Sequence, residues 1–114
     1  MAQRRPALSG YRMMWLYVMF DLPVGTPGER KAATKFRKFL LDEGFEMAQF
    51  SVYLRFADSK ESAETYMGRI GEALPKKGKV HIVTLTDKQY ENARIFTGRK
   101  GEPRPKNPDQ LALF

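Results

Sequence analysis

Residues 14–23 read MWLYVMFDLP, and the rest of the chain can be placed around this stretch. Seven apolar or aromatic side chains in a row are followed by one carboxylate, Asp21, and then by a turn that contains Pro23. Such a run is too short to cross a membrane, and it predicts a strand that is buried on both faces. Because an unpaired carboxylate is costly inside a core, we expect Asp21 at the C-terminal end of the strand, the edge at which ligands and metals collect in α/β folds.

The composition predicts one small folded domain with a polyanionic partner. The 114 residues are 42% hydrophobic, which suffices for a single core. The chain has no cysteine, no signal-peptide core and no membrane-spanning segment, so we expect a cytoplasmic protein without disulfides, thiolate sites or a membrane partner. With 20 Lys and Arg against 13 Asp and Glu, the formal charge of +7 favours nucleic acid as the partner over a merely solubilising surface charge.

A capping pattern directly after the first strand predicts a helix. Thr26 can cap the helix, Pro27 suits its first position, and Glu29 can reach back to the Thr26 amide. The helix should run to about Glu43 and end at Gly44, a residue suited to the left-handed position after a helix.

Two more strands, a second helix and a last long strand follow. Residues 45–56 are rich in strand formers but too long for one strand, so two short strands should fold back near residues 49–51. A second capping pattern at residues 58–61 predicts a helix to about Leu74. Residues 79–86 again form a run that reads as a buried strand.

The resulting βαββαβ order predicts an α+β, ferredoxin-like fold with an extra C-terminal edge strand and a tail. The ferredoxin-like domain should cover residues 14–97, after a flexible N-terminal arm at residues 1–13 and before an extended tail at residues 98–114. Within it, residues 87–94 read as a polar turn or a brief helix, and residues 95–97 as the edge strand.

The first strand also predicts a dimer. Both helices of this fold must cover one face of the sheet, yet the first strand is apolar on both of its faces. The simplest cover for the second face is another copy of the chain, which gives a two-fold homodimer.

Asp21 is the acid whose position is most demanding, and two interpretations of it are open. Alone it is a poor magnesium site, but in a two-fold dimer it would meet its symmetry mate. Two carboxylates could then hold Mg²⁺ at the interface, activate water and cleave a phosphodiester, which makes Asp21 the candidate catalytic and metal residue. Alternatively, Asp21 caps the loop to Thr26 or accepts backbone amides. His81 is expected to be a packed or edge residue rather than a ligand or base.

The basic residues fall into clusters that we expect to contact nucleic acid. They do not alternate with aromatic residues in a base-stacking pattern, so the contacts should go to phosphates and read shape rather than sequence. The candidates are Arg30, Lys31, Lys35, Arg37 and Lys38 in the first helix, and Lys76, Lys77 and Lys79 before the last long strand.

The C-terminal segment is expected to be a docking arm. It is rich in proline and carries a third basic group, made up of Arg99, Lys100, Arg104 and Lys106. Its last residues include Leu111, Leu113 and Phe114, an apolar tip that cannot fold on itself. We therefore expect the tip to dock on a partner chain by strand addition.

Three motifs together resemble a known family. FDLP at residues 20–23, the basic helix from about Arg30, and QFSVY at residues 49–53 are similar to the second core adaptation protein of CRISPR systems. This is the small CRISPR-associated endonuclease-like subunit that partners the integrase, and the resemblance covers about residues 14–97. It implies a ferredoxin-like homodimer that bridges integrase dimers and holds double-stranded protospacer DNA along a basic surface during spacer acquisition.

The resemblance also implies that the chain could be a metal-dependent endonuclease. Members of this family have been assigned Mg²⁺-dependent nuclease activity on RNA or DNA at the aspartate that matches Asp21, whereas others act only as scaffolds. A tyrosine is common in the family at the position of Phe20, so any role of that hydroxyl is absent here. Toxin-type ribonucleases with the same fold are one alternative, and a ferredoxin-like regulatory module for a small metabolite is another.

Overall fold

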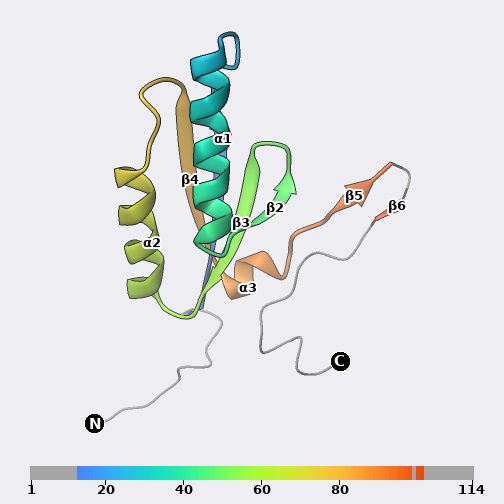
Figure 1. Ribbon diagram of the computed structural model, residues 1–114. Coiled ribbons are helices and arrows are strands. Elements are labelled where there is room, and N and C mark those ends of the chain that lie inside the picture. Colours follow the sequence, from blue (N-terminus) through green and yellow to red (C-terminus); the bar gives the residue numbers. More distant parts are fainter. Residues whose placement is uncertain (1–12, 99, 102–114) are drawn as a thin grey trace.

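A four-stranded antiparallel sheet forms the centre of the molecule (Figure 1). The computed structural model describes residues 13–98, 100 and 101. The first strand, β1 (Met14–Asp21), lies between β3 (Val52–Ala57) and β4 (Lys79–Thr86), and β2 (Glu46–Gln49) pairs with β3, in the order β2-β3-β1-β4. This confirms the predicted ferredoxin-like order and the central place of the apolar run.

Two helices cover one face of this sheet (Figure 1). They are α1 (Pro27–Asp42) and α2 (Lys60–Glu72). The predicted capping box of α1 is present, because Thr26 Oγ1 accepts from the Glu29 amide and Glu29 Oε1 accepts from the Thr26 amide, both at 3.1 Å. Gly44 follows α1 with φ +91°, and a Cβ there would meet the Arg55 guanidinium, so glycine is favoured at this position.

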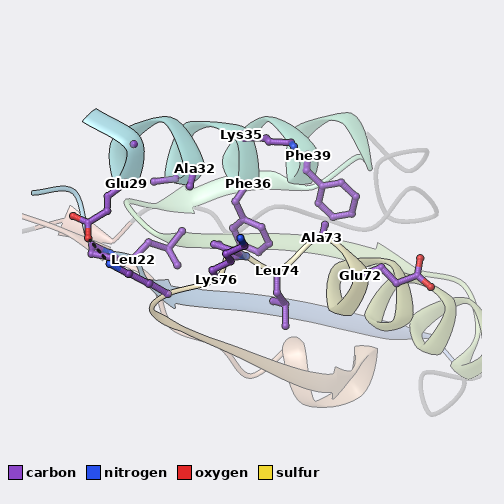
Figure 2. Close-up of a pocket in the computed structure, with 15 residues that line it drawn as sticks. Leu22, Glu29, Ala32, Lys35, Phe36, Phe39, Glu72, Ala73, Leu74 and Lys76 are labelled. Carbon is purple, nitrogen blue, oxygen red and sulfur yellow. Dashed lines mark ion pairs between the residues drawn. The ribbon is translucent and has the colours of Figure 1, made fainter. Parts of the chain in front are cut away.

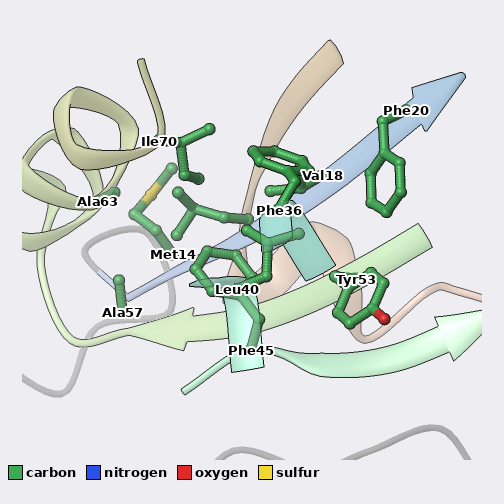
Figure 3. Close-up of a cluster of buried hydrophobic side chains, with 11 residues drawn as sticks. Met14, Val18, Phe20, Phe36, Leu40, Phe45, Tyr53, Ala57, Ala63 and Ile70 are labelled. Atoms are coloured by element: carbon green, nitrogen blue, oxygen red, sulfur yellow. The ribbon is translucent and has the colours of Figure 1, made fainter. Parts of the chain in front are cut away.

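The main core lies between the sheet and the two helices, and Figure 3 shows its side chains converging there. β1 contributes every second residue, as the period of a strand requires. The ring of Phe20 meets that of Phe36 edge to face at 5.2 Å, and Leu16, Leu40 and Ile70 are fully buried. Burial of these side chains fixes the register of β1, since a slip by one residue would exchange its two faces.

The opposite face of the sheet is covered in part by the chain itself. Helix α3 (Asp87–Tyr90) places the Tyr90 ring 4.1 Å from the ring of Trp15, and both are buried together with Leu54. Trp15 Nε1 donates to Asp87 Oδ1 at 2.7 Å, so the buried carboxylate and the indole support each other. The brief helix was one of two options for this segment, but its cover over β1 was not predicted.

The last long strand is less buried than predicted. β4 lies at the edge of the sheet, where one side has no neighbouring strand. Val80 and Ile82 are half-buried against the core, whereas His81 and Val83 on the other face are exposed. The sequence shows an apolar run but not which strand ends at the edge of the sheet, and this explains the difference. His81 is an edge residue, as expected.

The C-terminal strand forms but does not join the four-stranded sheet. β5 (Phe96–Thr97) pairs instead with β6 (Lys100–Gly101) as a separate two-stranded ribbon (Figure 1). Leu111, Leu113 and Phe114 of the predicted tail, and residues 1–12 of the predicted arm, lie outside the described residues. Met13 is buried, and its carbonyl accepts from the Asp87 amide at 2.8 Å. Within the described part of the chain, no helix is both long and apolar enough to span a bilayer.

Candidate nucleic-acid interface

Asp21 lies at the exposed C-terminal end of β1, as the sequence predicts. Side chains alternate along a strand, so Asp21 belongs to the same face as Tyr17 and Met19, away from α1 and α2. In the register of β1 and β4, its partner across the ladder is Lys79. The side chains of Asp21 and Lys79, one negative and one positive, are therefore attached at neighbouring backbone positions at this end of the sheet.

Two turns pack against the end of β1. On one side the Ser51 carbonyl, in the turn between β2 and β3, accepts from the Phe20 amide at 3.0 Å. On the other side Gly78 has φ +97°, and a Cβ there would lie 2.6 Å from the Asp21 carbonyl oxygen. Contacts on both sides hold the backbone of Asp21 in place, while its side chain faces solvent.

The Asp21 carboxylate is not used by the fold. Within residues 13–98, 100 and 101, no hydrogen bond or ion pair engages it. The structural alternative for Asp21 was to cap the loop to Thr26 or to accept backbone amides, and its carboxylate does neither within the described residues. The cap of α1 is formed by Thr26 and Glu29. A charged group that is held on a buried strand and has no structural role is available for binding or chemistry.

The described residues of one chain do not assemble a metal cluster around Asp21. In the part of the chain that the structure describes, no three or more His, Cys, Asp or Glu side chains come together in a way that could hold an ion. Mg²⁺ prefers oxygen ligands and can take one or two carboxylates together with waters and substrate phosphates. The residues therefore fit a shared site better than a single-chain one, with one carboxylate from each of two copies.

The predicted basic residues of α1 lie along its solvent side. Arg30, Lys31, Lys35 and Lys38 are exposed, and Arg37 is half-buried. Three of the five have partners within the chain, since Arg30 donates to the Val24 carbonyl, Arg37 to Thr34, and Lys38 pairs with Asp42 at 3.5 Å. Such exposed contacts are weak, so a phosphate could displace them.

Three of the predicted lysines meet around one pocket. Lys35 of α1 and Lys76 and Lys77 of the loop before β4 line a cavity of about 520 Å³ (Figure 2). Its floor is apolar, and Figure 2 shows Leu22, Phe36 and Leu74 beside the space between α1 and the chain that leaves α2. Lys77 Nζ lies 3.6 Å from Glu29 Oε2. The pocket begins at Leu22, one residue after Asp21, so the lysine rim and the free carboxylate share one end of the molecule.

Other notable groups were not predicted as site residues. The guanidinium carbons of Arg55 and Arg69 lie 4.2 and 5.6 Å from the centroid of the Tyr66 ring. Arg69 donates to Glu43 at 2.9 Å, and this hydrogen bond, with the charge of Glu43, raises the pKa of Arg69 above its usual value. These contacts join α2 to the C-terminal end of α1, so we assign them to stability.

Phe50 is a second such group. By residue type it is strand material, but it lies in the fold-back predicted near residues 49–51, where it occupies the turn between β2 and β3 and is 91% exposed. The turn contains no glycine, proline or asparagine, so no residue type in it indicates that this aromatic side chain is presented to solvent.

The chain matches one protein family, described as CRISPR associated protein Cas2, over residues 14–93. A relative from Paracidovorax avenae, named CRISPR-associated endoribonuclease Cas2, is 59% identical over 94% of this chain and 99% of its own length. Relatives with the same name from Flavobacterium psychrophilum and Streptococcus mutans are 48% and 42% identical, over 94% and 89% of this chain and 93% and 92% of their own lengths.

A solved structure described as "Crystal structure of cas2" has the same fold. It superposes with a TM-score of 0.54 at 20% identity, over 82% of this chain and 97% of its own.

Proposed function

The chain belongs to the family of CRISPR-associated Cas2 proteins, and on that premise we propose that it acts as a homodimer that binds nucleic acid and cleaves phosphodiester bonds at Asp21. The observation that carries the proposal is the exposed Asp21 carboxylate, which has no role in the fold of the described chain. The names of the relatives, which call them endoribonucleases, support RNA as a substrate.

A second copy would complete the site. Asp21 lies on the sheet face that α1 and α2 leave uncovered, so two copies that pack these faces together would bring two carboxylates to the interface. A magnesium ion bound there would supply an activated water and offset the charge of the phosphate. In each chain Asp21 would hold the ion, and Lys79, its neighbour across the ladder, would bind the phosphate.

The nuclease proposal predicts that Asp21→Asn abolishes cleavage. The substitution keeps the size and polarity of an exposed side chain but removes its charge, so the fold should be unaffected and the loss should be at least about 100-fold, the scale of a lost essential group. Cleavage of a single-stranded RNA and of a DNA duplex is measured with Mg²⁺ and with EDTA. Asp42→Asn, an exposed acid on α1, is the matched control. Full activity of Asp21→Asn would place the site elsewhere.

A second candidate function is a scaffold for spacer acquisition, as the resemblance implies. It is favoured by the exposed cations of α1 and of the loop before β4, of which Lys35 and Lys76 form no ion pair within the described residues. We propose that this surface holds the phosphates of protospacer DNA while the dimer bridges integrase subunits, and that the apolar tip at Leu111, Leu113 and Phe114 docks on the integrase.

The scaffold proposal predicts that Lys35→Glu with Lys76→Glu weakens binding of a DNA duplex. The slope of log K against log salt is negative, and each lost phosphate contact should make it shallower by about 1, so the two substitutions together should make it shallower by about 2. Lys60→Glu, at the start of α2, is the matched charge reversal away from the pocket. Unchanged affinity and slope in the double variant would exclude this surface as the DNA-binding site. A mixture of integrase and the Asp21→Asn protein separates the two functions. If it still inserts a duplex into a repeat array, the scaffold role does not need the carboxylate of the proposed nuclease site.

A further inference from the structure

Phe50 is an aromatic side chain that the fold exposes beside the candidate catalytic carboxylate. It is 91% exposed, more than any other large hydrophobic residue in the described chain, and Phe96 follows at 75%. Exposure of a full phenyl ring is unfavourable in water, and nothing in the described structure covers it. The ring is therefore available for a ligand.

The backbone fixes where this ring is presented. β2 ends at Gln49 and β3 begins at Val52, so Phe50 and Ser51 form the whole turn. Ser51 adopts the left-handed region with φ 63°, a strained conformation for a residue with a Cβ, and its carbonyl is bound by the Phe20 amide at 3.0 Å. The pairing of β1 with β3 ends at Met19 and Val52, and the bond from Phe20 to Ser51 holds the turn against the end of β1. Phe50 precedes Ser51 and Asp21 follows Phe20, so the two residues extend from bonded neighbours.

We infer that Phe50 stacks on an unpaired base of a single-stranded nucleic acid whose phosphate lies at Asp21. Aromatic side chains bind single strands in this way, because every base offers a π-face. In a duplex the bases stack on one another, so the ring would have no base face to contact. The inference rests on the proposed nuclease site and names its substrate as single-stranded. It adds a base contact to the phosphate contacts that the sequence predicts.

A charge on the other side of Asp21 agrees with this assignment. β1 lies between β3 and β4, so the turn with Phe50 and Lys79 of β4 flank the end of β1 from opposite sides. Lys79 can bind the phosphate that joins the stacked nucleotide to its neighbour. Stacking and phosphate binding would then act on adjacent groups of one strand. Binding through the ring should be nearly independent of salt, whereas binding through the lysines should weaken as salt rises.

The test uses the full-length Asp21→Asn protein, which cannot consume the probe, and three substitutions of Phe50. Phe50→Tyr keeps the ring, Phe50→Leu keeps apolar bulk without it, and Phe50→Ala removes both. Phe96→Ala is the matched control at another exposed phenylalanine. Dissociation constants are measured for a fluorescently labelled single-stranded RNA, the same sequence as single-stranded DNA, and the DNA duplex.

We expect Phe50→Ala and Phe50→Leu to weaken binding of single strands by about 5- to 100-fold, the range found for the loss of one stacked base. Phe50→Tyr and Phe96→Ala should bind as the Asp21→Asn background does, and the duplex affinity should not change. A preference between the RNA and the DNA strand would report a contact to the 2′-hydroxyl and leave the stacking role intact.

Four results would overturn the inference. Equal affinity of Phe50→Ala and the background for single strands would remove the stacking role. Equal affinity of Phe50→Leu would show that apolar bulk is sufficient. A shift of Phe50→Ala to a smaller species on a sizing column would assign the ring to an interface between copies. If the background binds no nucleic acid at all, the proposed function fails as well, whereas loss of binding in Phe50→Ala would support stacking even if no cleavage is detected.

Discussion

At the scale of single residues, Asp21 and Ser51 show how a small fold keeps side chains for function. The carboxylate of Asp21 could have capped a following helix, but Thr26 and Glu29 cap α1 instead. Ser51 accepts a left-handed conformation with φ 63° where a glycine would cost nothing. The position of Asp21 could be predicted, because a lone acid after an apolar run must lie at the rim of the core. The conformation of Ser51 could not, because its residue type carries no signal for it.

The conformation of Ser51 leads to a prediction about stability. Ser51→Val should lower the free energy of unfolding by about 1–2 kcal/mol, since a β-branched side chain is strongly disfavoured in the left-handed region. Ser51→Gly should change it by less, because relief of strain is offset by the greater entropy of the unfolded chain. Urea denaturation followed by circular dichroism measures both. Equal stability of the valine and glycine variants would contradict the strained geometry of this turn.

At the scale of elements, the sequence was informative wherever a local rule determines the structure. The capping box at Thr26 and Glu29, the end of α1 at Gly44 and the fold-back near residues 49–51 are all confirmed. Long-range contacts were harder to foresee. Tyr90 covers Trp15 from a polar segment that shows no apolar periodicity. β5 pairs with β6, and the sequence of a two-residue strand does not indicate which strand it will pair with.

The site divides along the same line. The sequence identified Asp21 and the lysines by residue type and order, and the structure places Lys35, Lys76 and Lys77 around one pocket. The apolar floor of that pocket was not foreseen. It forms between α1, the chain that leaves α2 and Leu22, and such packing of separate segments does not follow from the periodicity of any one of them. The exposure of Phe50 depends on the conformation of the turn: the fold-back was predicted, but not which side chain it presents to solvent.

Substitution to alanine should have opposite effects on stability at the end and in the interior of a helix. Thr26→Ala removes the acceptor of the Glu29 amide and should lower the free energy of unfolding by about 1 kcal/mol. Gly68→Ala, at an exposed interior position of α2 where an added Cβ meets nothing within 4 Å, should raise it by about 0.5–1 kcal/mol. Thermal unfolding of both variants measures the signs. Stabilisation by Thr26→Ala would contradict the capping box.

At the scale of the whole molecule, the two faces of the sheet differ in how fully they are covered. One face is closed by α1 and α2, while α3 covers the other only around Trp15. Beyond α3, Tyr17 and Met19 are half-buried, and Val83 is 41% exposed. The chain thus covers more of this face than the sequence suggested. A second copy would therefore cover the half of this face that ends at Asp21.

This uncovered half predicts where a dimer can be broken. Val83 lies opposite Tyr17 in the ladder and faces the same side, so Val83→Glu would place a charge in the middle of the interface without disturbing the core. We expect light scattering to give a dimer for the parent protein and a monomer for Val83→Glu, with unchanged circular dichroism. Leu41→Glu, on α1 with 53% exposure, is the matched control and should remain dimeric. A dimer that survives Val83→Glu but not Leu41→Glu would place the interface on the helical side and separate the two Asp21 carboxylates, which would exclude a shared metal site.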